Sequence, residues 1–151
     1  MHTPCTIAGV SLRQLRLVST PRGKVREFVR CDDPDFPGFG QVHVVETLPG
    51  VVRAWYRHQH QVDQLNAIAG RCRVCLFDDR PGSPSHGNFM EVVLSHDQPA
   101  VLSFPAQIWH GFATVGDTPS VIVQHNSRAF NHQNPDEEKR PADDTYFPVV
   151  W

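Results

Sequence analysis

The sequence predicts an all-β protein, a sandwich or barrel of short strands in which helix is a minor component. Seven segments are rich in β-branched, aromatic and other apolar residues. Turn-forming glycines, prolines and aspartates separate these segments. Many short strands with regular turns are typical of sandwiches and barrels. The expected strands are residues 41–48, 51–58, 64–70, 71–77, 90–95, 100–104 and 120–126.

The segments outside these strands are less clearly patterned. Residues 11–18 have some helical periodicity, but the same residues also suit a strand. Residues 135–140 are a run of charges that predicts a solvated turn or one turn of helix. Residues 128–151 are polar and then aromatic, so we expect them to wrap over the barrel. The main turn signals are Pro49-Gly50, Gly70, residues 78–82, residues 97–99 and Gly116-Asp117.

Length and composition indicate one soluble domain spanning residues 1–151. A chain of 151 residues with 40% hydrophobic residues is long enough to bury a core without disulfides or metal. The net charge of −2 argues against nucleic-acid and membrane-surface binding. No apolar run approaches the roughly 20 residues that cross a bilayer. The first residues lack the pattern of a signal peptide, so we expect a cytoplasmic protein.

Cys72 and Cys75 form a C-x-x-C pair without a second pair at the spacing of a zinc site. They lie in a segment that alternates like a strand, in which residues three apart point to opposite faces. We therefore expect packing thiols, together with two more free thiols at Cys5 and Cys31, as in a reducing compartment.

Four short motifs occur in one order along most of the chain. They are Arg22-Gly23 with Glu27, residues 39–41 with 50–56, residues 70–80, and Phe104-Pro105 with residues 110–112. Together they resemble the dTDP-4-dehydrorhamnose 3,5-epimerase family. The resemblance implies a cupin domain, which is a jelly-roll barrel or double-stranded β-helix. It also implies a homodimer that binds a nucleotide-linked 4-keto-6-deoxyhexose and removes protons next to the keto group.

The chain departs from this family at the positions that carry its chemistry. The family's histidine base is replaced by Tyr56, and the position of its tyrosine acid, counted from His110, is Val123. A lysine of the family is replaced by Asp63. Valine has no proton to give, and a phenol with a pKa near 10 is a poor base at neutral pH. We therefore expect the standard 3,5-epimerase activity to be absent or weak.

Histidines supply candidate replacements for the missing pair. Tyr56, His58 and His60 share one face of a strand because side chains alternate. We expect His110 to lie across the same cavity, with His58 and His110 as candidate bases and His125 as the donor. His125 lies on the face of Val123.

The resemblance also implies four substrate-binding residues: Arg22, Glu27, Gln41 and Arg53. Arg53 lies an odd number of positions from Tyr56, so it can reach the cavity only if its strand is irregular. No cofactor is expected for this reaction.

Two alternatives remain open at this point. The string Tyr56-x-His58 followed by Asp63 and Gly70, with His110 later, is similar to the metal-binding pattern of cupins. His58, Asp63 and His110 would then form a set of two histidines and one carboxylate that suits Fe(II) or a similar divalent ion. The other alternative is a cupin that binds a sugar or nucleotide without catalysis.

Overall fold

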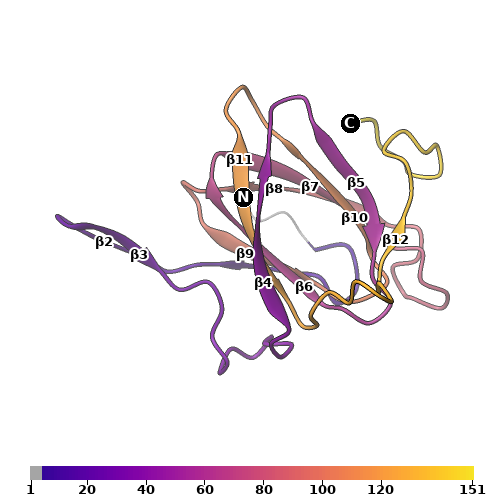
Figure 1. Ribbon diagram of the computed structural model, residues 1–151, viewed down its shortest axis with the longest axis horizontal. Coiled ribbons are helices and arrows are strands. Elements are labelled where there is room, and N and C mark those ends of the chain that lie inside the picture. The colour runs from indigo at the N-terminus through magenta and orange to yellow at the C-terminus, as the bar shows by residue number, and fades with distance from the viewer. Residues whose placement is uncertain (1–4) are drawn as a thin grey trace.

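Two five-stranded antiparallel sheets and one separate hairpin make up the computed structural model, which describes residues 5–151 (Figure 1). Residues 1–4 lie outside that range. They belong to the expected domain and to the N-terminal stretch for which no signal peptide is predicted. The first sheet has the order β1 (Ser11–Gln14), β9 (Ala100–Phe104), β6 (Asp63–Ala69), β11 (Ser120–Asn126) and β4 (Gln41–Thr47). The second sheet has the order β12 (Glu138–Lys139), β5 (Val52–Arg57), β10 (Trp109–Thr114), β7 (Arg71–Phe77) and β8 (Phe89–Ser95).

The seven predicted strands are all present, as β4 to β9 and β11, and the predicted all-β class is confirmed. The expected minor helix is wrong for the described residues, because residues 5–151 contain only strands, turns and irregular segments. Residues 11–18 divide between β1 and the start of β2 (Leu17–Thr20), which pairs with β3 (Gly23–Arg26). With no helix in residues 5–151, the structure offers no helical membrane span there.

The main core lies between the two sheets and follows strand alternation. On β8, Met90, Val92 and Leu94 are buried, whereas Glu91 and Val93 are exposed. They pack in one cluster with inward side chains of the other sheet, such as Leu65 and Ile122. The two sheets therefore form a barrel with a filled interior at one end.

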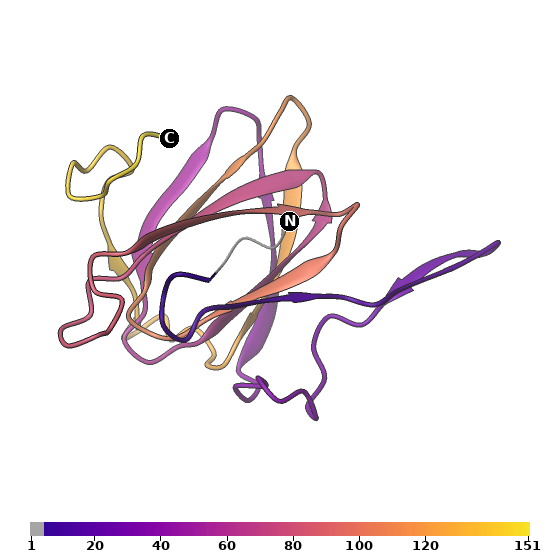
Figure 2. The ribbon, with the colours of Figure 1, turned by 180° about the vertical axis from the view of Figure 1, so that it is seen from behind.

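A second core covers the outer face of the β5–β10–β7 region. Trp55, Trp109, Cys75 and Phe147 form a buried cluster that the C-terminal segment closes. Figure 2 shows this segment running along the outside of the barrel, so the expected wrapping is confirmed. Cys72 belongs to the main core instead, so the two cysteines do point to opposite faces. Burial raises the pKa of Cys72 to about 11 and that of Cys75 to about 12, as expected of packing thiols.

The charge run at residues 135–140 is neither a helical turn nor a solvated turn. Its residues include β12, which pairs with β5 at Tyr56 and Arg57. Beyond β12, the backbone N–H of Arg140 donates to the Trp55 carbonyl at 3.0 Å, and the Trp55 N–H donates back at 2.8 Å. The segment therefore pairs through backbone hydrogen bonds with the free edge of β5. A helical turn would make its hydrogen bonds within the segment instead.

Candidate functional site

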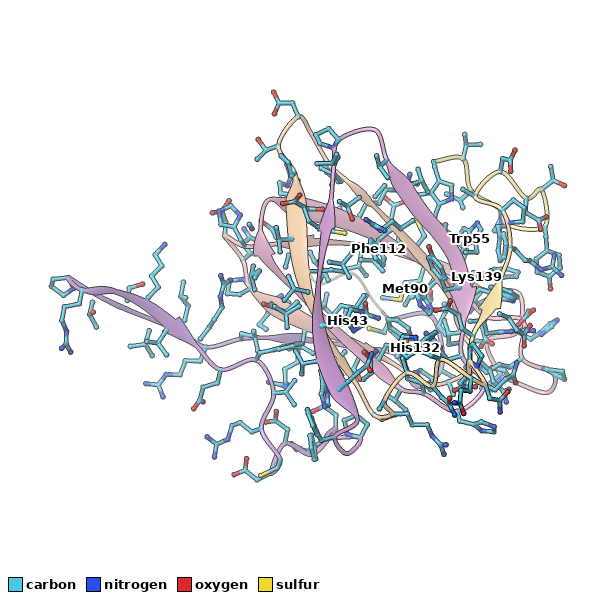
Figure 3. The ribbon with its side chains drawn as sticks, viewed as in Figure 1. His43, Trp55, Met90, Phe112, His132 and Lys139 are labelled. Carbon is cyan, nitrogen blue, oxygen red and sulfur yellow. The ribbon has the colours of Figure 1, made fainter. Side chains whose placement is uncertain are left out.

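A cavity of about 390 Å³ lies between β4 and β11 on one wall and β5 and β10 on the other. The loops that follow β5 and β11 complete its rim. Figure 3 labels three of its residues: His43 on β4, Phe112 on β10 and His132 on the loop before β12. Five of the polar side chains singled out in the sequence line this cavity: Gln41, Arg53, Tyr56, His58 and His110.

The β5–β10 wall brings Tyr56, His110 and Arg53 to one cavity. Tyr56 pairs with His110, but the next pair is Arg53 with Phe112, so the register shifts by one residue between them. Because of this irregularity, Arg53 and Tyr56 lie on the same face of β5, as expected if Arg53 is to reach the cavity. Arg53 donates to Thr47 Oγ1 at 3.2 Å and to the Glu46 carbonyl at 3.0 Å, at the rim.

His58, Asp63 and His110 form a buried cluster at the base of the cavity. Their exposed fractions are 7%, 1% and 3%, and one potential ligand atom of each lies within 4.8 Å of the others. The two imidazole rings are stacked with centroids 5.5 Å apart. Asp63 lies behind the histidines, and its Oδ1 accepts hydrogen bonds from Gln61 Nε2 at 2.6 Å and from Asn126 Nδ2. Local amides therefore hold the carboxylate in place.

Backbone carbonyls fix the tautomers of both histidines. The Nδ1 atom of His58 lies 2.6 Å from the Asp136 carbonyl, and that of His110 lies 3.1 Å from the Ile108 carbonyl. A carbonyl oxygen only accepts, so each Nδ1 carries the proton and each Nε2 presents a lone pair. These Nε2 atoms lie 3.7 and 3.9 Å from Asp63 Oδ2. Three electron-rich atoms facing one another are stabilised by a positive charge among them, either an extra proton or a metal ion.

The electrostatics of His110 favour the neutral ring. Burial lowers the pKa of His110, and the nearby Asp63 carboxylate only partly opposes that effect. A neutral imidazole with a bare Nε2 is able to accept a proton.

Asp136 holds the strand end that carries His58. Its carboxylate accepts the backbone N–H groups of Gln59, His60 and Gln61 at 2.9, 3.0 and 3.1 Å. These hydrogen bonds lower the pKa of Asp136 against the opposing effect of burial. Asp136, which belongs to the charge run, thus fixes the backbone that follows His58. The composition of the run does not predict this role.

The β4–β11 wall contributes Gln41, His43, Gln124 and Asn126. Of these, the sequence predicts only Gln41 as a site residue. His43 could have been found from it, because residues two apart on a strand share a face. Gln41 Oε1 accepts the Phe130 N–H at 2.8 Å, and Gln41 Nε2 lies 3.5 Å from His43 Nδ1.

The placement of His125 in the cavity is wrong. His125 and Val123 do share a face of β11, but Gln124 and Asn126 face the cavity from that strand. His125 Nδ1 donates to Gln64 Oε1 at 2.9 Å, and its ring stacks between Phe36 and Phe39. Burial lowers the pKa of His125. A side chain on this outer face cannot reach a sugar that sits in the cavity.

Three other sequence-predicted residues lie away from the cavity. His60 is exposed, because β5 ends at Arg57 and the alternation does not continue. Arg22 is at the exposed turn of the β2–β3 hairpin, which projects from the barrel in Figure 1. Glu27 follows that hairpin and pairs with Arg30 at 3.2 Å. Within one chain these residues do not join the site.

Glu137 and His132 also line the cavity and were not predicted. Glu137 accepts from Lys139 Nζ at 2.9 Å, and that ammonium lies 5.7 Å from the Tyr56 ring centroid. Nothing in the sequence pattern distinguishes Glu137 from its charged neighbours. Only the pairing of β12 with β5 brings it to the site.

The sequence comparisons agree on one family. The family model described as dTDP-4-dehydrorhamnose 3,5-epimerase matches residues 4–151. A probable low-salt glycan biosynthesis epimerase, Agl13 of Haloferax volcanii, is 34% identical over 152 residues, covering 96% of this chain and 94% of the relative.

Solved structures share the fold. A dTDP sugar isomerase from Desulfovibrio desulfuricans G20 superposes with a TM-score of 0.92 at 31% identity, over 99% of this chain and 95% of that one. The 3'-monoepimerase ChmJ of Streptomyces bikiniensis, solved in complex with dTDP-quinovose, gives a TM-score of 0.87 at 20% identity, over 100% of this chain and 78% of that one. The predicted jelly-roll barrel of the cupin class is thereby confirmed.

Proposed function

Because the chain belongs to the dTDP-4-dehydrorhamnose 3,5-epimerase family of carbohydrate biosynthesis, we propose that it epimerises or isomerises a nucleotide-linked 4-keto-6-deoxyhexose with a reassigned set of acid and base groups. The observation that carries the proposal is the cluster of His58, Asp63 and His110 at the base of the cavity. Two imidazoles there direct their Nε2 atoms toward a carboxylate that stabilises a charged ring once a proton arrives.

The proposed reaction begins at the carbon next to the keto group. His110 Nε2 takes the proton from that carbon, and the electron pair of the C–H bond moves into the carbonyl to form an enolate. Asp63 stabilises the imidazolium that results, and His58 is the alternative base in the same cluster. The phenol of Tyr56, whose ring centroid lies 6.1 Å from that of His110, is the candidate acid that returns a proton. Because Tyr56 and His110 lie on the same wall, this pair suits an isomerisation in which the proton leaves and returns on one face of the sugar.

Arg53 and Gln41 are the candidate binding groups for the nucleotide-linked part of the substrate. Both line the cavity, and the Arg53 guanidinium at the rim suits a diphosphate. Arg22 and Glu27 would complete the site only from the projecting hairpin of a second copy.

A homodimer is therefore part of the proposal. The hairpin exposes Val18 and Val25 at 42% and 65%, and the outer face of β4 exposes Val42 and Val44 at 51% and 61%. These apolar surfaces suit burial against a second copy. Light scattering at micromolar concentration is expected to give twice the chain mass of 17.0 kDa, and a stable monomer would contradict this part of the proposal. The free thiols support a cytoplasmic location.

We expect weak turnover of dTDP-4-keto-6-deoxyglucose itself. Tyr56 replaces the histidine base and no tyrosine faces the cavity from β11, and loss of a positioned acid or base lowers a rate by about 10²–10⁴-fold. NMR of the sugar product, compared with a family member that keeps both residues, measures this difference. Turnover equal to that of the comparison enzyme would mean that Tyr56 and its surroundings replace the pair fully.

A metal-dependent cupin is the second candidate, because the same three residues form a set of two histidines and one carboxylate whose ligand atoms lie within 4.8 Å of one another. Both histidines direct Nδ1–H to a carbonyl and Nε2 to the cluster, and amides hold the second oxygen of Asp63. Elemental analysis after incubation with Fe(II), Mn(II) or Zn(II) and extensive dialysis separates the two candidates. About one equivalent of metal, lost in an Asp63→Ala variant, would favour the metal enzyme over the acid–base reading.

A further inference from the structure

We propose that His43 is the hydrogen-bond donor to the keto oxygen of the sugar, and that it stabilises the enolate from the wall opposite His110. The inference rests on the proposed function, since it requires a keto sugar in the cavity. Removing a proton next to a carbonyl moves negative charge onto the carbonyl oxygen, and a positioned donor at that oxygen lowers the barrier.

The protonation of His43 follows from its neighbours. The backbone N–H of Phe130 donates to Gln41 Oε1 at 2.8 Å, which fixes the orientation of the Gln41 amide. Gln41 Nε2 then directs its N–H toward His43 Nδ1 at 3.5 Å. An Nδ1 that accepts leaves the proton of the neutral ring on Nε2. His43 is therefore the reverse of His58 and His110, which carry their protons on Nδ1.

The positions of His110 and His43 suit the removal of the proton and the stabilisation of the enolate oxygen in one reaction. His110 lies on β10 and His43 lies on β4, so the base and the donor belong to opposite sheets and line the same cavity. His110 Nε2 accepts the carbon-bound proton while the electron pair moves to the oxygen. His43 keeps its own proton throughout and donates only a hydrogen bond, so no further reactant is needed.

Most other donors in the cavity are already engaged, lie on the wrong wall or lie deeper than His43. The amides of Gln61 and Asn126 donate to Asp63. Tyr56 is the strand partner of His110 and lies on the same wall. Gln124 is the strand partner of His43, but with 6% of its surface exposed it lies deeper, whereas His43 is only half-buried.

The test compares two substitutions at one position. His43→Leu removes the donor, and His43→Gln keeps an amide N–H. With the 4-keto sugar that the wild type exchanges fastest, His43→Leu is expected to lower kcat for solvent-deuterium exchange by about 10²–10³-fold. His43→Gln is expected to retain most of the lost rate, within about tenfold of the wild type. His96→Leu, on an exposed loop away from the cavity, is the matched control and should change nothing.

Binding measurements distinguish the role in the reaction from simple binding. Affinity for the nucleoside diphosphate alone should be unchanged in His43→Leu, because the proposed contact is to the keto oxygen. A loss of that affinity with kcat retained, or an unchanged kcat in His43→Leu, would overturn the inference. An absence of exchange by the wild type with every keto sugar would instead overturn the proposed function on which it rests.

Discussion

Replacing His110 by glutamine is expected to slow solvent-deuterium exchange next to the keto group by about 10²–10⁴-fold. His110 combines a neutral ring, a bare Nε2 and a place in the wall of the cavity. Glutamine keeps a polar side chain of similar reach but cannot accept a proton at neutral pH. Exchange is measured by NMR with the nucleotide-linked 4-keto sugar that the wild type exchanges fastest.

His60→Gln is the matched control for this substitution. His60 is exposed, lies two residues after His58 in the segment that follows β5, and does not line the cavity. Exchange should therefore stay at the wild-type rate. Thermal unfolding of each variant checks that the barrel is intact. Full exchange activity in a folded His110→Gln protein would mean that His58 is the base. Exchange by a double variant of His58 and His110 would mean that the base lies outside the cluster.

Asp63→Ala is expected to lower the free energy of unfolding by about 2–6 kcal/mol, because each of two buried donors left without an acceptor costs about 1–3 kcal/mol. Asp63 is 1% exposed, and its loss leaves the Gln61 and Asn126 amides without their acceptor and removes the carboxylate that faces His58 and His110. Denaturant unfolding of the two proteins measures the difference.

Asp63→Asn separates the charge of this residue from its shape. The asparagine oxygen can still accept from both amides, so the expected destabilisation is smaller, about 1–3 kcal/mol. Exchange activity should fall in both variants, because neither keeps the charge that stabilises a protonated imidazole. An Asp63→Ala protein as stable as the wild type would contradict the account of the cluster as a tightly coupled unit.

Strands β4 and β8 could be predicted because their residues alternate between a covered and an exposed face, and β9 could be predicted because it is a short, largely apolar run. β10 was missed because it shows neither pattern. Trp109, His110 and Phe112 are all buried, so the segment shows no alternation. Gly111 lies among them at a close approach, where a Cβ atom would come within 2.5 Å of the Ala54 side chain.

The error at His125 comes from register, which residue spacing does not determine. Counting from His110 to Val123 passes through a turn and a bulge near Val121, and a slip of one residue turns a side chain to the opposite face. A bulge also brings Arg53 to the cavity, which alternation alone would exclude. The contribution of Glu137 depends on strand pairing between distant segments, so no local pattern predicts it.

Solvent exchange by the wild-type protein, freed of metal by a chelator, measures proton removal next to the keto group directly. The protein is incubated in deuterium oxide with nucleotide-linked 4-keto-6-deoxyhexoses that differ in nucleotide and configuration, and NMR follows the carbons next to the keto group. The account predicts deuterium at one of these carbons, well above a protein-free control, with at least one sugar. Binding of the nucleotide sugars without any deuterium incorporation would contradict it and leave a binding protein.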